Sequence, residues 1–155
     1  MKNKKNDKQL SKITIYFANN EKITKWNSFL YLYNDEELKW FNLNDLSIAN
    51  FKYMFIKIID FTTKNEEYIF LEKCDIFKEN DNINIFSTNK KNSYFQQKQY
   101  SKKNDKIKIL KQDLKELLKF NKIDNSINTA IEIENKKRDI YLETVVNFLK
   151  IKKEI

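Results

Sequence analysis

The chain has 155 residues and a formal net charge of +8, with 41% hydrophobic and 14% aromatic residues. This length and apolar content suit a folded protein with a hydrophobic core and argue against disorder throughout. The sequence has no glycine, proline or histidine and one cysteine, which excludes Ser-His-Asp catalysis, histidine or thiolate zinc centres and glycine-rich phosphate loops.

Lysine, asparagine, isoleucine, phenylalanine and tyrosine dominate, and these residues share A/T-rich codons. An AT-rich genome is the simplest cause, so part of the basic charge reflects codon usage rather than an anionic partner. Cys74 lies in the apolar-flanked run FLEKCDIF, which predicts a buried structural thiol. No apolar run has the length of a signal core or a membrane span, and we expect a cytoplasmic protein without membrane contact.

The first predicted strand is KITIYFA. Ile13, Ile15 and Phe17 fall on one face of this segment, and Thr14 and Tyr16 fall on the other. Alternation of apolar and polar residues with a period of two is typical of a half-buried strand. We therefore expect the first set of side chains to face a core.

Several more short strands are expected before residue 88, because aromatic and β-branched residues are concentrated there. They are SFLYLY, KWFNL, FKYMFIKIIDF, EYIFLEK, CDIFK and INIFS. Turns are expected at Asn19-Asn20, Asn34-Asp35, Asn65 and Asn80-Asp81-Asn82. In a chain without glycine, asparagine and aspartate are the residues best able to adopt positive φ.

The second half of the sequence has helical periodicity. One amphipathic helix is indicated by Ile107, Leu110, Leu114, Leu117 and Leu118. Another is expected to run from about Asp139, with Leu142, Val145, Val146 and Leu149 on one face. The segment 127–136 between them fits either a strand or a helix.

The order of these elements predicts an α+β fold: an N-terminal antiparallel β-sheet or small barrel-like unit, followed by two or three C-terminal helices. We expect a basic N-terminal arm at 1–12 and a β-rich unit at 13–88. A basic connector containing aromatic residues follows at 89–105, and a helical unit at 106–155 is expected to pack on the sheet within one compact domain.

The basic charge is concentrated in the connector, because residues 87–112 contain eight lysines and one aspartate. Lysines could neutralise phosphates there, and aromatic rings could stack on unpaired bases. With Arg138 as the sole arginine, base reading by guanidinium groups is nearly absent, so binding should be driven by the nucleic-acid backbone. The predicted nucleic-acid-binding residues are Lys90, Lys91, Tyr94, Phe95, Lys98, Tyr100, Lys102, Lys103, Lys106 and Lys108.

The leading hypothesis is therefore a small non-catalytic protein that binds RNA or another single-stranded nucleic acid, such as a ribonucleoprotein or replication accessory component. A connecting loop whose aromatic rings dock on the sheet remains the alternative for this segment. No cofactor and no metal are expected. The oligomeric state is left open, because the apolar stripe of the last helix could pack within the chain or against a second copy.

A second hypothesis is a protein–protein interaction module, such as an inhibitor or accessory factor of the kind that mobile elements encode. It would use an aromatic β surface, because tyrosine and tryptophan are favoured where a ring is buried at an interface. The candidate residues are Trp26, Tyr31, Tyr33, Trp40 and Phe41.

A third hypothesis is a metal-dependent nuclease. Asp124, Glu134 and Lys136 loosely resemble the D…E-x-K pattern of restriction-type nucleases, in which carboxylates hold the metal and a lysine polarises the attacked phosphate or water. The pattern is weak in a chain so rich in lysine and acidic residues, and we expect no enzymatic activity.

Overall fold

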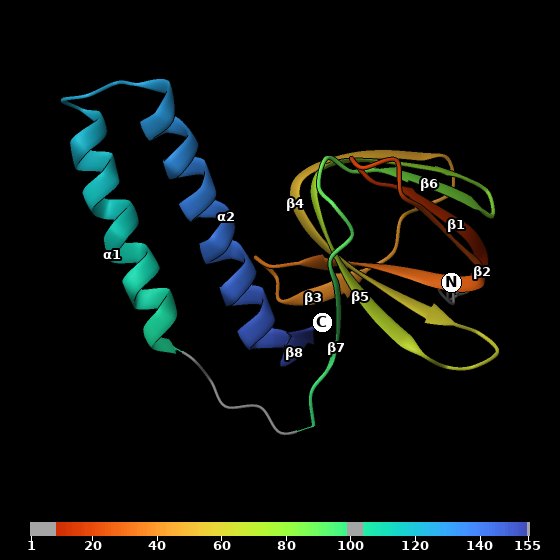
Figure 1. Ribbon diagram of the computed structural model, residues 1–155. Helices are drawn as coiled ribbons and strands as arrows, with labels where there is room; N and C mark the ends of the chain where they lie inside the picture. The colour runs from red at the N-terminus through yellow and green to blue at the C-terminus, as the bar shows by residue number, and fades with distance from the viewer. Residues whose placement is uncertain (1–8, 99–103, 155) are drawn as a thin grey trace, which may run out of the picture. The chain divides into compact units, whose positions relative to one another are not determined.

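The computed structural model describes residues 9–98 and 104–154 of the chain (Figure 1). The chain divides into two compact units, Met1–Phe95 with Lys153–Ile155 and Gln96–Lys152. The predicted α+β class is confirmed, because a mixed β-barrel of five strands is followed by two helices.

From β1 to β7 the strands follow one another with short connections, and β8 comes after the two helices. They are β1 (Ser11–Tyr16), β2 (Lys22–Asn34), β3 (Lys39–Phe41), β4 (Ser47–Asp60), β5 (Glu66–Glu79), β6 (Asn82–Phe86), β7 (Ser93–Gln96) and β8 (Ile151–Lys153). The helices are α1 (Asn104–Asn121) and α2 (Ile127–Leu149).

The barrel is closed by a parallel seam between its first and last strands. Antiparallel pairing joins β1 to β2, β2 to β4, β4 to β5 and β5 to β6. β6 then pairs in parallel with β1, so that Lys12 lies opposite Asn82 and Tyr16 lies opposite Phe86. The antiparallel arrangement expected from the sequence therefore holds around the ring except at this seam.

The barrel interior is filled by side chains that face inward and alternate with outward-facing side chains along each strand. Ile13 and Ile15 are fully buried, and Phe17 is 5% exposed, as the alternation in the first strand predicts. The core also contains Leu32, Ile56, Ile69, Leu71, Ile76 and Ile85. Cys74 is a free thiol in the same core, which confirms the predicted structural role.

Positive φ angles occur at leucine and lysine residues as well as at asparagines. Asn20 and Asn80 adopt left-handed conformations at two of the predicted turns. The others are Asn27, Leu38, Leu46, Lys64, Lys73 and Lys150. Lys73 lies inside β5, so the predicted strands EYIFLEK and CDIFK are one strand of 14 residues with a left-handed residue within it.

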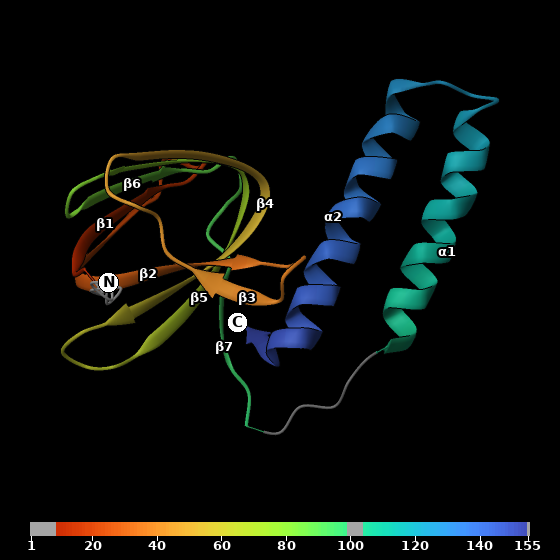
Figure 2. The same ribbon diagram turned by 180° about the vertical axis from the view of Figure 1, so that it is seen from behind.

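The second unit is a helical hairpin in which α1 and α2 lie side by side (Figure 2). Lys136 Nζ lies 3.1 Å from Asp113 Oδ2, and Lys106 Nζ lies 2.5 Å from Glu143 Oε1, so ion pairs link the helices at two levels. Exposed pairs of this kind add little stability individually, and the packed apolar faces supply more.

The helix α2 begins earlier than its predicted start near Asp139. The Ser126 hydroxyl accepts a hydrogen bond from the Thr129 N–H and caps the first turn. Thr129 and Ile133 are buried along this early part of the helix, which resolves the ambiguous segment as helical. No helix in the described part of the chain is long and apolar enough to cross a lipid bilayer.

Candidate functional site on the outer face of the barrel

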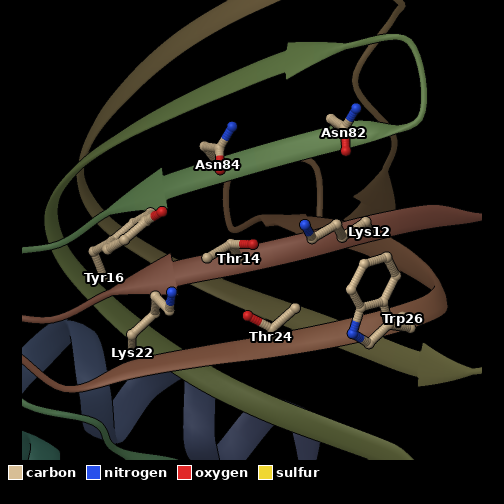
Figure 3. Close-up of a pocket in the computed structure, with 8 residues that line it drawn as sticks. All are labelled: Lys12, Thr14, Tyr16, Lys22, Thr24, Trp26, Asn82 and Asn84. Atoms are coloured by element: carbon tan, nitrogen blue, oxygen red, sulfur yellow. The ribbon is translucent and has the colours of Figure 1, made fainter.

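A surface hollow of about 420 Å³ lies over the outer face of β1, β2 and β6 (Figure 3). Because Ile13 and Ile15 point into the core, the residues that alternate with them on β1 point outward. Strands β1 and β2 contribute Lys12, Thr14, Tyr16, Lys22, Thr24 and Trp26. Asn82 and Asn84 come from β6.

The strand register arranges these side chains in rows across the face. Thr14 lies opposite Thr24 on β2 and opposite Asn84 on β6. Tyr16 lies opposite Lys22 on one side and Phe86 on the other. Directly opposed residues of neighbouring strands lie close enough for their side chains to interact, so each row can act as one contact surface.

One end of the face carries a group of exposed aromatic rings. The rings of Tyr16 and Phe86 are stacked with 4.8 Å between centroids and 6° between planes. Phe77 on β5 meets Phe86 edge-on at 5.9 Å. Tyr16 is 36% exposed, Phe86 is 45% exposed and Phe77 is 41% exposed. These three side chains form an accessible aromatic platform.

The other end of the face carries Trp26, which is 62% exposed. Lys12 Nζ lies 4.4 Å from the centroid of this indole ring, and Lys22 Nζ lies 5.9 Å from the centroid of Tyr16. Both distances fall within the range of cation–π attraction. Each ammonium group is thereby held beside an aromatic surface.

Charge is unevenly distributed across the face. Within the described residues, the hollow is lined by two lysines together with hydroxyl, amide and aromatic side chains. The acidic residues begin on β5, where Asp75 lies opposite Phe86 and Glu79 lies opposite Asn82. The outward-facing formal charge in the hollow is therefore positive on β1 and β2, and it is negative at Asp75 and Glu79 on β5.

The predicted basic strip is divided between the two units of the chain. In the first unit Lys90 and Phe95 are exposed, whereas Lys91 Nζ lies 3.6 Å from Glu67 Oε1. Tyr94 is 8% exposed and packs against Phe55 at 5.2 Å, so this ring is not available for stacking on a base. The first part of the strip thus presents fewer free groups than the sequence suggested.

The remainder of the strip belongs to the second unit. Lys98 and Lys108 are exposed, and Lys106 is paired with Glu143. Tyr100, Lys102 and Lys103 lie outside the described residues. Binding of nucleic acid by these lysines stays a prediction.

The aromatic residues proposed for a protein partner do not form one exposed surface. Tyr33 is 2% exposed, and its ring lies 5.1 Å from that of Trp40. Burial, followed by the charge of Asp35, raises the pKa of the Tyr33 phenol. Tyr31, Trp40 and Phe41 are half-buried. Of this set, Trp26 is strongly exposed and belongs to the hollow.

Two residues of the nuclease-like pattern, Glu134 and Lys136, lie on α2, and Asp124 lies in the loop between α1 and α2. Glu134 and Lys136 are two positions apart on α2, which separates their side chains by roughly 200° around the helix axis. Lys136 is paired with Asp113, and Glu134 accepts a hydrogen bond from Lys137. Among the described residues no group of three or more cysteine, aspartate or glutamate side chains could hold a metal ion.

The asparagines of the hollow carry a weak signal in the sequence. In NINIF the polar Asn82 and Asn84 alternate with buried isoleucines, which marks them as outward-facing. Alternation alone does not reveal that β6 lies beside β1. The site exists because that pairing places Asn84 next to Thr14.

Comparison with known proteins supplies a family for the barrel. Residues 12–92 match the family model described as the UU051 N-terminal domain. The matched segment begins within β1 and ends before β7, so it contains every strand of the closed barrel. No curated protein matches the chain.

Proposed function

The chain belongs to the family of the UU051 N-terminal domain, and we propose that its barrel is a non-catalytic module that binds RNA or another single-stranded nucleic acid through the outer face of β1, β2 and β6. The proposal keeps the partner class expected from the sequence and moves the principal contact from the connector to the barrel. Lysines of the connector that remain exposed, such as Lys90 and Lys98, would add non-specific attraction for phosphates.

The observation that carries this proposal is the combination of exposed rings and ammonium groups on one face. Trp26 and the aromatic platform offer flat surfaces on which bases can stack, each base contributing about 1–3 kcal/mol. Lys12 and Lys22 lie beside those rings and can neutralise phosphates. Asn82 and Asn84 add amide groups that can donate and accept hydrogen bonds.

The test is a titration of the full chain with a fluorescently labelled single-stranded oligonucleotide of about twelve nucleotides, across a range of salt concentrations. We expect binding that weakens as salt rises. Combining Lys12→Ala with Lys22→Ala should reduce the salt slope by about 1.4, because each lost phosphate contact contributes about 0.7 for single strands.

A matched variant separates the site from the net charge of the protein. Combining Lys111→Ala with Lys115→Ala removes the same charge from exposed positions on α1. This variant should bind almost as tightly as the unaltered protein. Equal losses in the two variants, or an affinity that does not respond to salt, would exclude the proposed site.

A protein partner is the second candidate, and one observation favours it. Leu46 and Ile48 are 75% and 80% exposed, and Ile48 lies opposite Phe77 on the neighbouring strand. Apolar side chains continuous with an aromatic platform are typical of a protein-binding surface. Under this alternative, Ile48→Ser would abolish capture of a partner from source extract, and nuclease treatment would leave the capture intact.

A further inference from the structure

Resting on the proposed function, we propose that the outer face fixes the orientation of the bound strand and its base preference. The sugar-phosphate backbone lies over β1, the base that is read lies over β6 and β5, and a neighbouring base turns to the opposite side and stacks on Trp26 of β2. At the β5 side the face favours adenine, with its 6-amino group, and cytosine, with its 4-amino group, over thymine and uracil, which carry a carbonyl oxygen at position 4.

The position of the backbone follows from the charge distribution. Lys12 and Lys22 stand on β1 and β2, whereas Asp75 and Glu79 stand on β5. All four residues occupy outward-facing positions, and β6 separates the strands of the two lysines from β5. A phosphate placed over β5 would be repelled by two carboxylates, while one placed over β1 or β2 would meet an ammonium group.

The width of the face suits one nucleotide lying across it. Neighbouring strands are about 4.8 Å apart, so β5 lies roughly 10 Å from β1 when β6 is between them. A nucleotide reaches about that far from its phosphate to the outer edge of its base. The base edges therefore arrive at Asn82, Asn84 and Glu79 when the phosphate is held near Lys12.

The two aromatic surfaces accommodate more than one base along the strand direction. Lys12, whose ammonium group lies against the Trp26 ring, marks one end of the face. Tyr16 is four residues further along β1, which is roughly 13 Å in an extended strand. One base can stack on Trp26 and another on the Tyr16–Phe86 pair. The region between them contains the amides and threonine hydroxyls, as Figure 3 shows.

The base preference follows from the carboxylates at the β5 side. The carboxamide of Asn82 both donates and accepts hydrogen bonds, so by itself it accommodates any base edge. Glu79 lies directly opposite Asn82, and an ionised carboxylate only accepts. It can accept from the amino group of adenine or cytosine, and it repels the carbonyl oxygen that thymine and uracil carry at the corresponding position.

The experiment compares labelled dA, dC and dT oligomers of about twelve nucleotides on the full chain and on Glu79→Gln. Because a glutamine amide can donate as well as accept, this variant should lose the preference. The unaltered protein should bind dA and dC about fivefold more tightly than dT, the effect of roughly one hydrogen bond. In Glu79→Gln the dC-to-dT ratio should fall close to one.

Glu36→Gln is the matched control, because it removes an exposed carboxylate from the turn between β2 and β3. It should retain the ratio of the unaltered protein. The salt slope should be nearly the same in both glutamine variants, since neither touches a phosphate contact. Equal binding of the three oligomers, or a dC-to-dT ratio unchanged by Glu79→Gln, would overturn the inference while leaving single-strand binding intact. Absence of binding by all three at low salt would overturn the proposed function itself.

Discussion

The ammonium group of Lys12 lies 4.4 Å from the centre of the Trp26 ring, on the outside of a closed barrel. The pair comes from neighbouring strands, β1 and β2, and the ring is 62% exposed. Burial of a tryptophan in a core would stabilise the protein more than this arrangement does. A positive charge beside an accessible indole is instead suited to a ligand that has both a phosphate and an aromatic base.

Trp26→Ala should weaken binding of a single-stranded oligonucleotide by about 1–3 kcal/mol, the contribution of one stacked base. The free energy of unfolding should change by about 0.5 kcal/mol or less, because the side chain is mostly exposed. Anisotropy titration and urea denaturation measure the two quantities. A large loss of stability with unchanged affinity would assign Trp26 a structural role.

The intrinsic fluorescence of Trp26 offers a direct report of stacking. In a Trp40→Phe variant, Trp26 is the one tryptophan left in the chain, and a saturating concentration of oligonucleotide should quench its emission. Trp40 packs between Tyr33 and Tyr68, so phenylalanine preserves an aromatic ring at that position. Binding without any change in emission would show that no base reaches the indole.

Glu67 should contribute to stability at neutral pH and lose that contribution in acid. Burial raises the pKa of this carboxyl, but the hydrogen bond and charge of Lys25, the hydroxyl of Ser93 and the charge of Lys91 outweigh it, so the pKa is lowered overall. A carboxyl with a lowered folded-state pKa stabilises above its unfolded pKa, and the stabilisation is lost as pH falls through the folded pKa.

Glu67→Gln should therefore lower the free energy of unfolding by about 1–2 kcal/mol at pH 7, as expected for charge-assisted hydrogen bonds in a half-buried setting. The difference from the unaltered protein should shrink as the pH falls below the ordinary range of glutamate. Urea denaturation across pH measures it, with Glu36→Gln as the exposed control. A difference independent of pH would mean that shape, rather than charge, matters at this position.

Cys74 should resist thiol reagents in the folded protein. The side chain is fully buried. This burial, with a smaller contribution from the charge of Asp75, raises the pKa of the thiol to about 11. Below that pH the reactive thiolate is scarce, and the reagent has no access. Labelling at pH 8 should follow the rate of unfolding and become fast in denaturant, and rapid labelling of the native protein would contradict the buried position.

Lys64→Gly should raise the free energy of unfolding relative to Lys64→Ala, by up to about 1 kcal/mol. Lys64 has a φ of 62°, a left-handed conformation that glycine adopts without steric cost. Both variants lose the contact of the ammonium group with the Phe61 ring, so the comparison isolates the backbone. Denaturation midpoints measure the effect, and equal midpoints would indicate that the greater freedom of glycine in the unfolded chain cancels the gain.

Local patterns in the sequence were sufficient to predict the strands of the barrel and the helical half, but not β7 within the predicted connector or β8 after α2. Ile13 and Ile15 alternate with polar residues, and Leu110 and Leu114 follow helical spacing, so both elements were expected where they occur. The segment 127–136 was left open because Ile127, Ile131 and Ile133 also alternate like a strand, and the structure shows a helix that is capped by Ser126. The left-handed Lys73 within β5 has no local signal at all.

The site was largely inaccessible to sequence reasoning, because it depends on which strands are neighbours. Lys12 and Asn82 are adjacent only through the parallel β1–β6 seam, and no pattern in either segment specifies that partner. The concentration of lysines in the connector was the stronger sequence signal, so the nucleic-acid-binding residues were predicted in and beside that segment. Tyr94 looked like a stacking residue, yet its ring fills space against Phe55.

The parallel seam also has a consequence for synthesis of the protein. β1 emerges first from the ribosome, but its partner β6 becomes available only after the whole stretch between Tyr16 and Asn82 has been translated. Until then the nascent chain exposes one open edge of β1, and the rows that bring Thr14 beside Asn84 do not exist. The outer face of β1, β2 and β6 is therefore complete only once β6 has been synthesised and has paired with β1.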